Sequence, residues 1–187
     1  MCAQQTACAQ QTACVDTRLT HGAVAWQGMN INHGFALWFT VRELRPPVIV
    51  ESGVFQGFGT WLIRQAAGPD AHIINLDPTP VSQLRYKDPD ATLLMGSNFT
   101  DFGGVDWRHL IPDPAKRGRA LVVIDDHMSC VKRIGQMLDV GFRHLFFDDN
   151  WGLPYHAGGA FPDSYSFNAV CAPVQTERVP KQGITAC

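Results

Sequence analysis

The stretch VIVESGVFQGFGT, residues 48–60, places a short apolar strand directly before a glycine-rich turn and the start of a helix. Working outward, short apolar runs at residues 72–76, 92–95, 120–124 and 144–147 alternate with helical stretches. The run at 120–124 is apolar throughout, as expected of a strand that is buried on both faces. This alternation predicts a doubly wound, Rossmann-like α/β fold with a parallel sheet.

Helices are expected before and between these strands. Residues 32–44 carry apolar side chains at helical spacing, which we expect to pack on the sheet: Phe35, Ala36, Trp38, Phe39, Val41 and Leu44. A short helix fits residues 61–67. A further helix is predicted to begin near Ser129 and to end at Gly141, with one apolar face made of Val131, Ile134 and Leu138.

Size and charge exclude several classes of protein. A chain of 187 residues suits one domain with a substantial core. The formal net charge is -2, and no dense basic stripe is present to bind a nucleic acid backbone. Apolar runs fall far short of the roughly 20 residues that cross a bilayer. We therefore expect a soluble protein whose partner is a small molecule.

The ends of the chain differ in composition from the middle. Residues 1–20 contain the segment AQQTAC twice and are expected to form a flexible tail outside the domain at 21–187. Residues 151–187 are rich in Gly, Pro and aromatic side chains, and we interpret them as a lid or an edge segment. Their polar and aromatic residues are candidates to cover a substrate: Trp151, Tyr155, His156, Asp163 and Tyr165.

The six cysteines do not indicate a structural zinc site. Three of them, Cys2, Cys8 and Cys14, are explained by the repeated segment, and no CxxC pair occurs. The N-terminus has neither a basic region nor a continuous apolar run, so a secretory signal is not predicted. We expect a reducing, cytoplasmic location.

The glycine-rich turn after the first strand is the first candidate ligand site, because doubly wound sheets bind ligands beyond the carboxyl ends of their strands. Its glycines let the backbone turn sharply and approach a ligand closely. Their spacing is GxxxGxG, which matches neither the GxGxxG fingerprint of dinucleotide-binding proteins nor a P-loop.

The segment ExGxxxGxG resembles the first motif of class I S-adenosylmethionine-dependent methyltransferases. The resemblance implies a cofactor site at the four motif residues Glu51, Gly53, Gly57 and Gly59. It also implies that Asp77, at the end of the second strand, holds the ribose hydroxyls, and that Ser97 lies near the adenine. The alternative for Asp77 is a purely structural role, capping the turn at Pro78.

Acidic residues follow two strands that are expected to be neighbours. Asp125, Asp126 and His127 come after the fourth strand, and Asp148 and Asp149 after the fifth. Adjacent strands lie about 4.8 Å apart, so one carboxylate from each end can reach a single cation. Oxygen ligands of this kind favour Mg²⁺, Ca²⁺ or Mn²⁺. The alternative is an ordinary pair of solvated loop ends.

The two aspartates after the fourth strand are expected to differ in role. Asp125 and Asp126 point to opposite faces if the strand continues, so one is predicted to bind the metal. The other is predicted to cap the helix that begins near Ser129.

The acidic pattern is similar to that of the metal-containing branch of the superfamily, the macrocin O-methyltransferase and cephalosporin hydroxylase-like proteins. Carried over by position, the resemblance implies metal ligation by Asp125, Asp148 and Asp149, with magnesium the expected ion. It places His127 beside the metal as a base for methyl transfer from S-adenosylmethionine to a hydroxyl of a small molecule. The final strand pair of the family has no clear counterpart after Trp151.

The predicted fold and its acidic residues are also compatible with other functions. The same fold could bind a metal or a nucleoside without catalysis, or orient water as a metal-assisted hydroxylase or hydrolase. The missing sheet edge and the aromatic segment at residues 35–39 are also compatible with a homodimer that completes the site.

Overall fold

The computed structural model describes residue 29 and residues 31–148. Five parallel strands form one sheet in the order β3-β2-β1-β4-β5. Their bounds are β1 Val48–Ser52, β2 His72–Asp77, β3 Thr92–Met95, β4 Leu121–Ile124 and β5 His144–Phe147. The parallel sheet predicted from the sequence is confirmed. The expectations for the tail at 1–20 and for the segment at 151–187 lie outside the described residues.

The sheet is doubly wound. From β1 at its centre the chain proceeds to β2 and β3 on one side, then crosses to β4 and β5 on the other. The carboxyl ends of β1 and β4 therefore lie at the point where the strand order reverses. Ligands of Rossmann-like folds bind at this point.

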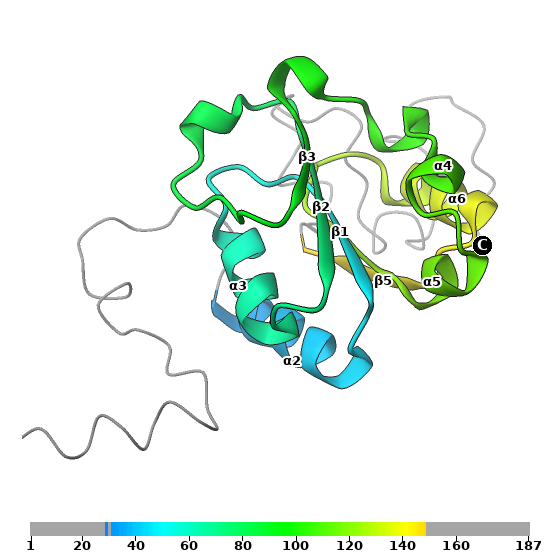
Figure 1. Ribbon diagram of the computed structural model, residues 1–187, viewed down its shortest axis with the longest axis horizontal. Helices are drawn as coiled ribbons and strands as arrows, with labels where there is room; N and C mark the ends of the chain where they lie inside the picture. The colour runs from blue at the N-terminus through cyan, green and yellow to red at the C-terminus, as the bar shows by residue number, and fades with distance from the viewer. Residues whose placement is uncertain (1–28, 30, 149–187) are drawn as a thin grey trace, which may run out of the picture.

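Helices cover both faces of the sheet (Figure 1). Helices α2 (Ile31–Leu44) and α3 (Phe58–Ala67) lie on one face; α4 (Trp107–Leu110), α5 (Pro114–Arg119) and α6 (Cys130–Val140) lie on the other. Successive strand residues serve the two layers in turn, since Ile49 packs with α2 and α3, while Val50 packs with the opposite layer. Within the described residues, no helix is long and apolar enough to cross a membrane.

The connections carry short 3-10 turns at Val81–Gln83, Gly96–Asn98 and Phe102–Gly104. Next to the last of these, Phe102, Trp107 and Phe142 pack ring against ring in the core, with centroids 4.8 to 6.1 Å apart. The Trp107 indole also donates a hydrogen bond to the Phe102 carbonyl at 2.9 Å. This cluster fixes the crossover from β3 to β4.

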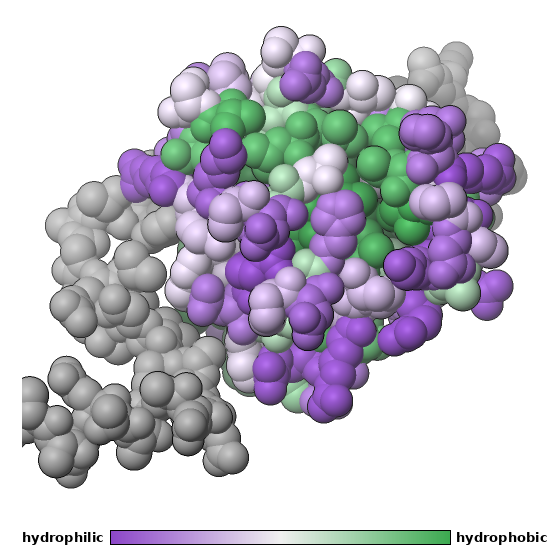
Figure 2. Space-filling view, in the orientation of Figure 1, coloured by the Kyte–Doolittle hydropathy of each residue, from purple (hydrophilic) through white to green (hydrophobic). Residues whose placement is uncertain are grey.

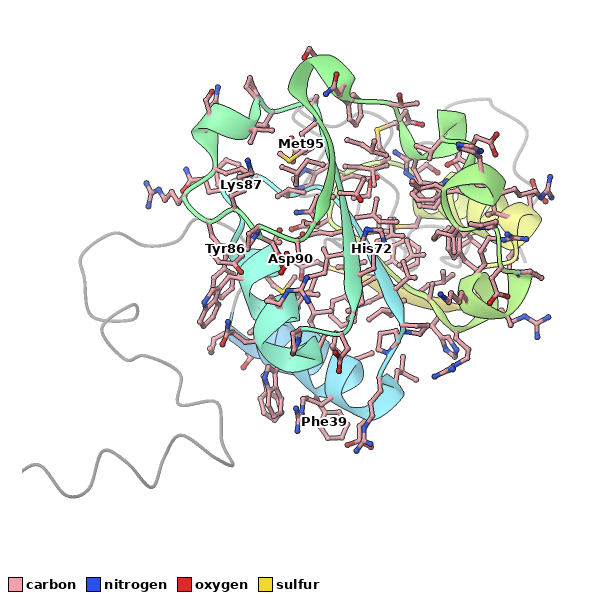
Figure 3. The ribbon with its side chains drawn as sticks, in the orientation of Figure 1. Phe39, His72, Tyr86, Lys87, Asp90 and Met95 are labelled. Atoms are coloured by element: carbon pink, nitrogen blue, oxygen red, sulfur yellow. The ribbon has the colours of Figure 1, made fainter. Side chains whose placement is uncertain are left out.

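The predicted face of α6 is wrong, and the predicted face of α2 is confirmed only for Trp38 and Val41. On α6, Val131 and Leu138 are exposed, and the buried side chains are Cys130, Arg133 and Met137. The helix is rotated in this way because the charge of Arg133 is satisfied inside the protein, as described below. On α2, the buried residues are Gly34, Leu37 and Val41, while Phe35 and Phe39 are 66% and 52% exposed. Figure 3 shows Phe39 pointing away from the sheet.

The surface is uneven in polarity. Hydrophobic residues gather over the upper part of the face shown in Figure 2, where β3 lies, and hydrophilic residues dominate below it. Three of the four residues of β3, Thr92, Leu93 and Leu94, are only half-buried. This exposure is expected of a strand that has a sheet neighbour on one side only, as β3 has within the described residues.

Candidate functional site

A small pocket, called the cavity below, opens beside the carboxyl ends of β1 and β4, at the reversal of the strand order. Its wall consists of the loop after β1, at residues 53–56, with Phe58 and Gly59 of α3. Met29, Glu51 and Asp125 complete the lining. The cavity thus lies where the fold and the glycine motif both predict a ligand.

The loop after β1 is held in place by one carboxylate. Asp77 Oδ2 accepts hydrogen bonds from the backbone N–H groups of Val54 and Phe55, at 2.6 and 2.8 Å. Asp77 Oδ1 accepts a third from the Thr79 N–H at 2.7 Å. Asp77 therefore caps the turn after β2 and also anchors the cavity wall. It has the structural role that was the alternative to ribose binding.

Two positions of the loop require glycine. Gly53 has φ +93°, and a Cβ there would lie 2.1 Å from the backbone oxygen of Asp125. Gly57 also has φ +93°, and a Cβ there would lie 2.2 Å from the carbonyl oxygen of Tyr86. The Gln56 carbonyl accepts the Tyr86 N–H at 3.2 Å, which locks the loop to the β2–β3 connection. Figure 3 shows Tyr86 beside α3.

Glu51 is a buried acid at the floor of the cavity. It is 2% exposed, and its Oε2 accepts a hydrogen bond from the Thr60 hydroxyl at 2.5 Å. The Asn75 amide in turn donates to the Thr60 oxygen at 3.0 Å. Burial raises the pKa of Glu51 to about 8, against the Thr60 hydrogen bond that lowers it and with the Asp77 charge that raises it further.

The acidic residues after β4 and β5 are neighbours, as predicted. Ile124 and Phe147 are register partners, and the Asp148 N–H donates to the Ile124 carbonyl at 2.9 Å. Asp125 lines the cavity, and Asp148 is buried beside it in the sheet. Asp149 lies outside the described residues.

Asp126 faces away from the cavity into an ion pair. Its Oδ2 accepts from Arg133 Nε at 2.9 Å and from the Ser52 hydroxyl at 2.6 Å. Its Oδ1 accepts from the Met128 N–H at 3.1 Å. The prediction that one of Asp125 and Asp126 caps α6 is therefore wrong. The helix is capped by Ser129, whose hydroxyl accepts a hydrogen bond from the Lys132 N–H.

Arg133 is the centre of a buried network that the sequence pattern does not reveal. Besides Asp126, its guanidinium holds Asp101, with NH2 2.7 Å from Oδ1 and NH1 3.1 Å from Oδ2. NH1 also donates to Gln136 at 2.9 Å. The hydrogen bonds from Arg133 hold the pKa of Asp101 below its ordinary value, although partial burial opposes them.

A second contact missed by sequence reasoning joins α2 to β5. His33 Nδ1 and Asp148 Oδ1 form a hydrogen-bonded pair, with the imidazole partly exposed and the carboxylate buried. The two residues lie 115 positions apart in the chain. An α2 histidine thus reaches the acidic strand ends, which places this helix at the edge of the site and not only under the sheet.

Three further predicted residues, Gly57, Ser97 and His127, are not among the residues that line the cavity. Gly57 begins α3 as its N-cap. His127 has φ +55° in the turn after Asp126. Ser97 is exposed in the turn after β3 and is absent from the cavity lining. Across residue 29 and residues 31–148, no group of three His, Cys, Asp or Glu side chains is placed to hold a metal ion.

The cavity has an acidic character. Its described lining includes two carboxyl groups, those of Glu51 and Asp125, and no Lys, Arg or His. Such a wall offers a phosphate group no positive partner, so a nucleotide bound by its phosphates does not fit. A neutral or positively charged ligand does, and the glycine loop lets it approach the backbone.

No family model matches the chain, and no curated protein does. Among solved structures, the chain is similar to CmcI in its apo form, with 17% identity over 80% of this chain and 70% of that one and a TM-score of 0.47. It is similar to CmcI with Mg-SAM at 18% identity, with the same coverage and a TM-score of 0.45. Cofactor-bound Rv0187 from MTB matches at 15% identity, over 65% and 56% of the two chains, with a TM-score of 0.44. Identities this low assign no residue roles to this chain.

Proposed function

We propose that this chain is an S-adenosylmethionine-dependent methyltransferase that methylates a hydroxyl group of a small molecule with the help of a divalent metal. One observation carries the proposal. The ExGxxxGxG loop, anchored by Asp77, forms the wall of an acidic cavity at the reversal point of a parallel sheet. A ligand with a sulfonium charge and no phosphate suits that wall.

The proposed contacts of the cofactor follow from the hydrogen-bond acceptor positions on Asp77 that the backbone of the loop does not occupy. A carboxylate has about four acceptor positions, and the three backbone N–H groups occupy three of those on Asp77. Oδ1 holds one of the three, so it retains capacity for a ribose hydroxyl. Glu51 and the loop residues would then face the methionine part of the cofactor.

The metal proposal rests on the two adjacent strand ends. Asp125 and Asp148 fit a divalent cation because both supply carboxylate oxygens from neighbouring strands. Asp149 is the third proposed ligand. Asp126 is the less suitable member of its pair, since Arg133 already neutralises it. When bound, the metal would lower the pKa of a substrate hydroxyl, and His127 is the proposed acceptor of its proton.

Calorimetric titration of the full chain with S-adenosylmethionine, with and without Mg²⁺, tests the proposal. We expect micromolar affinity, about -8 kcal/mol, for the cofactor. Asp148→Asn should weaken Mg²⁺ binding at least tenfold and leave cofactor affinity within about twofold, because a proposed metal ligand is lost while the described lining of the cavity is unchanged. Asp70→Asn, an exposed aspartate in the turn before β2, is the matched control and should change neither.

The outcomes separate the candidate functions. Cofactor binding followed by S-adenosylhomocysteine formation with a panel of polyol acceptors supports the methyltransferase. A metal isotherm without any cofactor heat would contradict it and favour a metal-assisted hydrolase. Cofactor binding without product under any metal or acceptor would indicate a binding module.

A further inference from the structure

The cavity contains a carboxyl group, that of Glu51, for which the described part of the chain supplies no counter-charge. Glu51 Oε2 accepts from Thr60, and Oε1 lies against the backbone of α3, where a Cβ on Gly59 would be only 2.3 Å away. On the β2 side stands Asn75, whose amide nitrogen is engaged by Thr60 and whose Oδ1 has no hydrogen-bond partner. On the β4 side the register partner is Val123. None of these neighbours is positively charged.

The charged groups of the surrounding elements do not neutralise it either. Asp77 at the end of β2 and Asp125 after β4 carry the same sign as an ionised Glu51. On α3, Arg64 is turned to the opposite end of the helix, where it donates to Asp88 at 2.6 Å and to backbone carbonyls. On α2, His33 is paired with Asp148 as described above, and no residue of this helix lines the cavity.

An isolated buried carboxylate is unfavourable, so the proton stays on Glu51 in the ligand-free protein. The pKa of Glu51 is raised to about 8, so its carboxyl group is mostly neutral at pH 7. A positive charge in the cavity would reverse the balance, since it supplies the partner that Glu51 lacks among residue 29 and residues 31–148. Binding and proton loss would then be linked.

We propose that Glu51 makes this cavity selective for a positively charged ligand, and that it releases its proton to solvent as that ligand enters. The inference rests on the proposed function, because S-adenosylmethionine is the cation expected there. Only the O–H bond of the carboxylic acid breaks: its electron pair stays on the carboxylate, the proton passes to the buffer base, and an ion pair forms with the ligand.

Calorimetry in two buffers tests the coupling. The full chain is titrated with S-adenosylmethionine at pH 7 without added divalent metal, once in phosphate and once in Tris, whose ionisation enthalpies differ. The difference in observed heat gives the number of protons released. We expect about one per ligand bound. The cofactor affinity should rise by up to about tenfold per pH unit between pH 5.5 and 7.

Two variants assign the proton to Glu51. Glu51→Gln imitates the neutral acid, so it should release no protons, and its affinity should lose the pH dependence. Glu43→Gln makes the same chemical change at an exposed position of α2 and should behave as the wild type.

S-adenosylhomocysteine distinguishes the two positive groups of the cofactor, because it keeps the ammonium and lacks the sulfonium. Proton release with both ligands places the ammonium at Glu51, and release with the methylated cofactor alone places the sulfonium there. Cofactor binding without proton release in the wild type, or equal release in Glu51→Gln, would overturn the inference and leave the proposed function standing. No binding of either ligand would overturn both.

A ligand-free measurement checks the protonation state by itself. Because the folded pKa of Glu51 lies near 8 and the ordinary value is 4.5, the folded state holds a proton that the unfolded state has lost across this interval. The unfolding equilibrium constant should therefore rise with pH between about 4.5 and 8, by up to about tenfold per pH unit. Glu51→Gln should remove this contribution. Parallel pH profiles for the two proteins would overturn the inference.

Discussion

Gly53 shows how closely one backbone can approach another at the bottom of the site. It packs on the carbonyl of Asp125, so the loop after β1 and the turn after β4 are in direct backbone contact. No flexible side chain separates them, and neither strand end can retreat without breaking sheet hydrogen bonds. The two halves of the cavity wall are therefore positioned by the same glycine.

We predict that Gly53→Ala destabilises the protein by at least about 2 kcal/mol, because it combines a positive φ with a backbone clash. Urea unfolding measures the effect. Gly135→Ala in α6 is the control, since nothing lies within 4 Å of a Cβ there. It should be neutral or stabilise by up to about 1 kcal/mol. A stable Gly53→Ala protein would show that the two turns can move apart.

A second prediction concerns Asp101, whose pKa is lowered by hydrogen bonds from Arg133. The unfolded chain takes up a proton at a higher pH than the folded protein does, so the stabilisation is present above about pH 4 and is lost as the pH falls through the lowered folded value. Asp101→Asn should be less stable than the wild type at pH 7, and the difference should shrink in acid. Chemical unfolding at several pH values measures this.

Asp139→Asn provides the comparison for Asp101, since Asp139 is an exposed acid of α6 whose carboxylate forms no ion pair with another described residue. Its stability should follow the wild type across the same pH range. A gap between wild type and Asp101→Asn that stays constant down to pH 2 would contradict the electrostatic explanation.

Among the elements, α2 differs most from its sequence pattern. Its apolar residues occur on too many sides of the helix for spacing alone to select a buried face. The structure buries Leu37 and Val41 and leaves Ile31, Phe35 and Phe39 exposed, one helical turn apart. The choice follows from the shape of α3, whose Leu62 contacts the helix next to Gly34.

This assignment of faces leads to a prediction. Leu37→Ala should cost about 2 to 5 kcal/mol, because the side chain is fully buried and leaves a cavity. Phe35→Ala, two residues earlier on the same helix, should change stability by about 0.5 kcal/mol or less, because the ring is largely exposed. Urea unfolding of both variants compares them. Equal losses would mean that Phe35 is packed in solution.

The predictability of the other elements depends on their length and charge. All five strands are apolar runs bounded by turn residues, so the sequence locates each within one or two positions. Helices α4 and α5, of four and six residues, are too short to show a helical period. The face of α6 was mispredicted because its buried Arg133 reads as a surface residue until Asp101 and Asp126 are known to surround it.

For the molecule as a whole, the sheet order decides which residues meet. Strand succession and the rule for parallel sheets predicted that Asp125 and Asp148 lie side by side, and the register confirms it. The glycine spacing predicted the cavity wall. The pair of His33 with Asp148 was beyond prediction, because it depends on where α2 packs and no local pattern records that. The protonation of Glu51 likewise depends on burial in three dimensions.

The strand order of the sheet also predicts which strands unfold locally most easily. Strand β1 is hydrogen-bonded to β2 and β4, whereas β3 and β5 each have one strand partner among the described residues. Amide hydrogen exchange, followed by mass spectrometry, should therefore be slowest in β1 and faster in β3 and β5, because the outer strands can open without unfolding the sheet. Protection of β3 equal to that of β1 would contradict this picture and indicate a single cooperative unit.

Asp77 has a consequence for anyone who wishes to redesign the cavity. Ligand preference is usually altered by exchanging the residues that face the ligand while the scaffold is left alone. Here the acid proposed to face the ribose also carries the backbone of Val54 and Phe55. A new side chain at this position must restore the hydrogen bonds to these two N–H groups, and that to Thr79, before it can recognise anything new. Redesign of the cavity would therefore begin with another side chain that accepts hydrogen bonds from the loop. Residue 77 could then be varied without loss of the loop conformation.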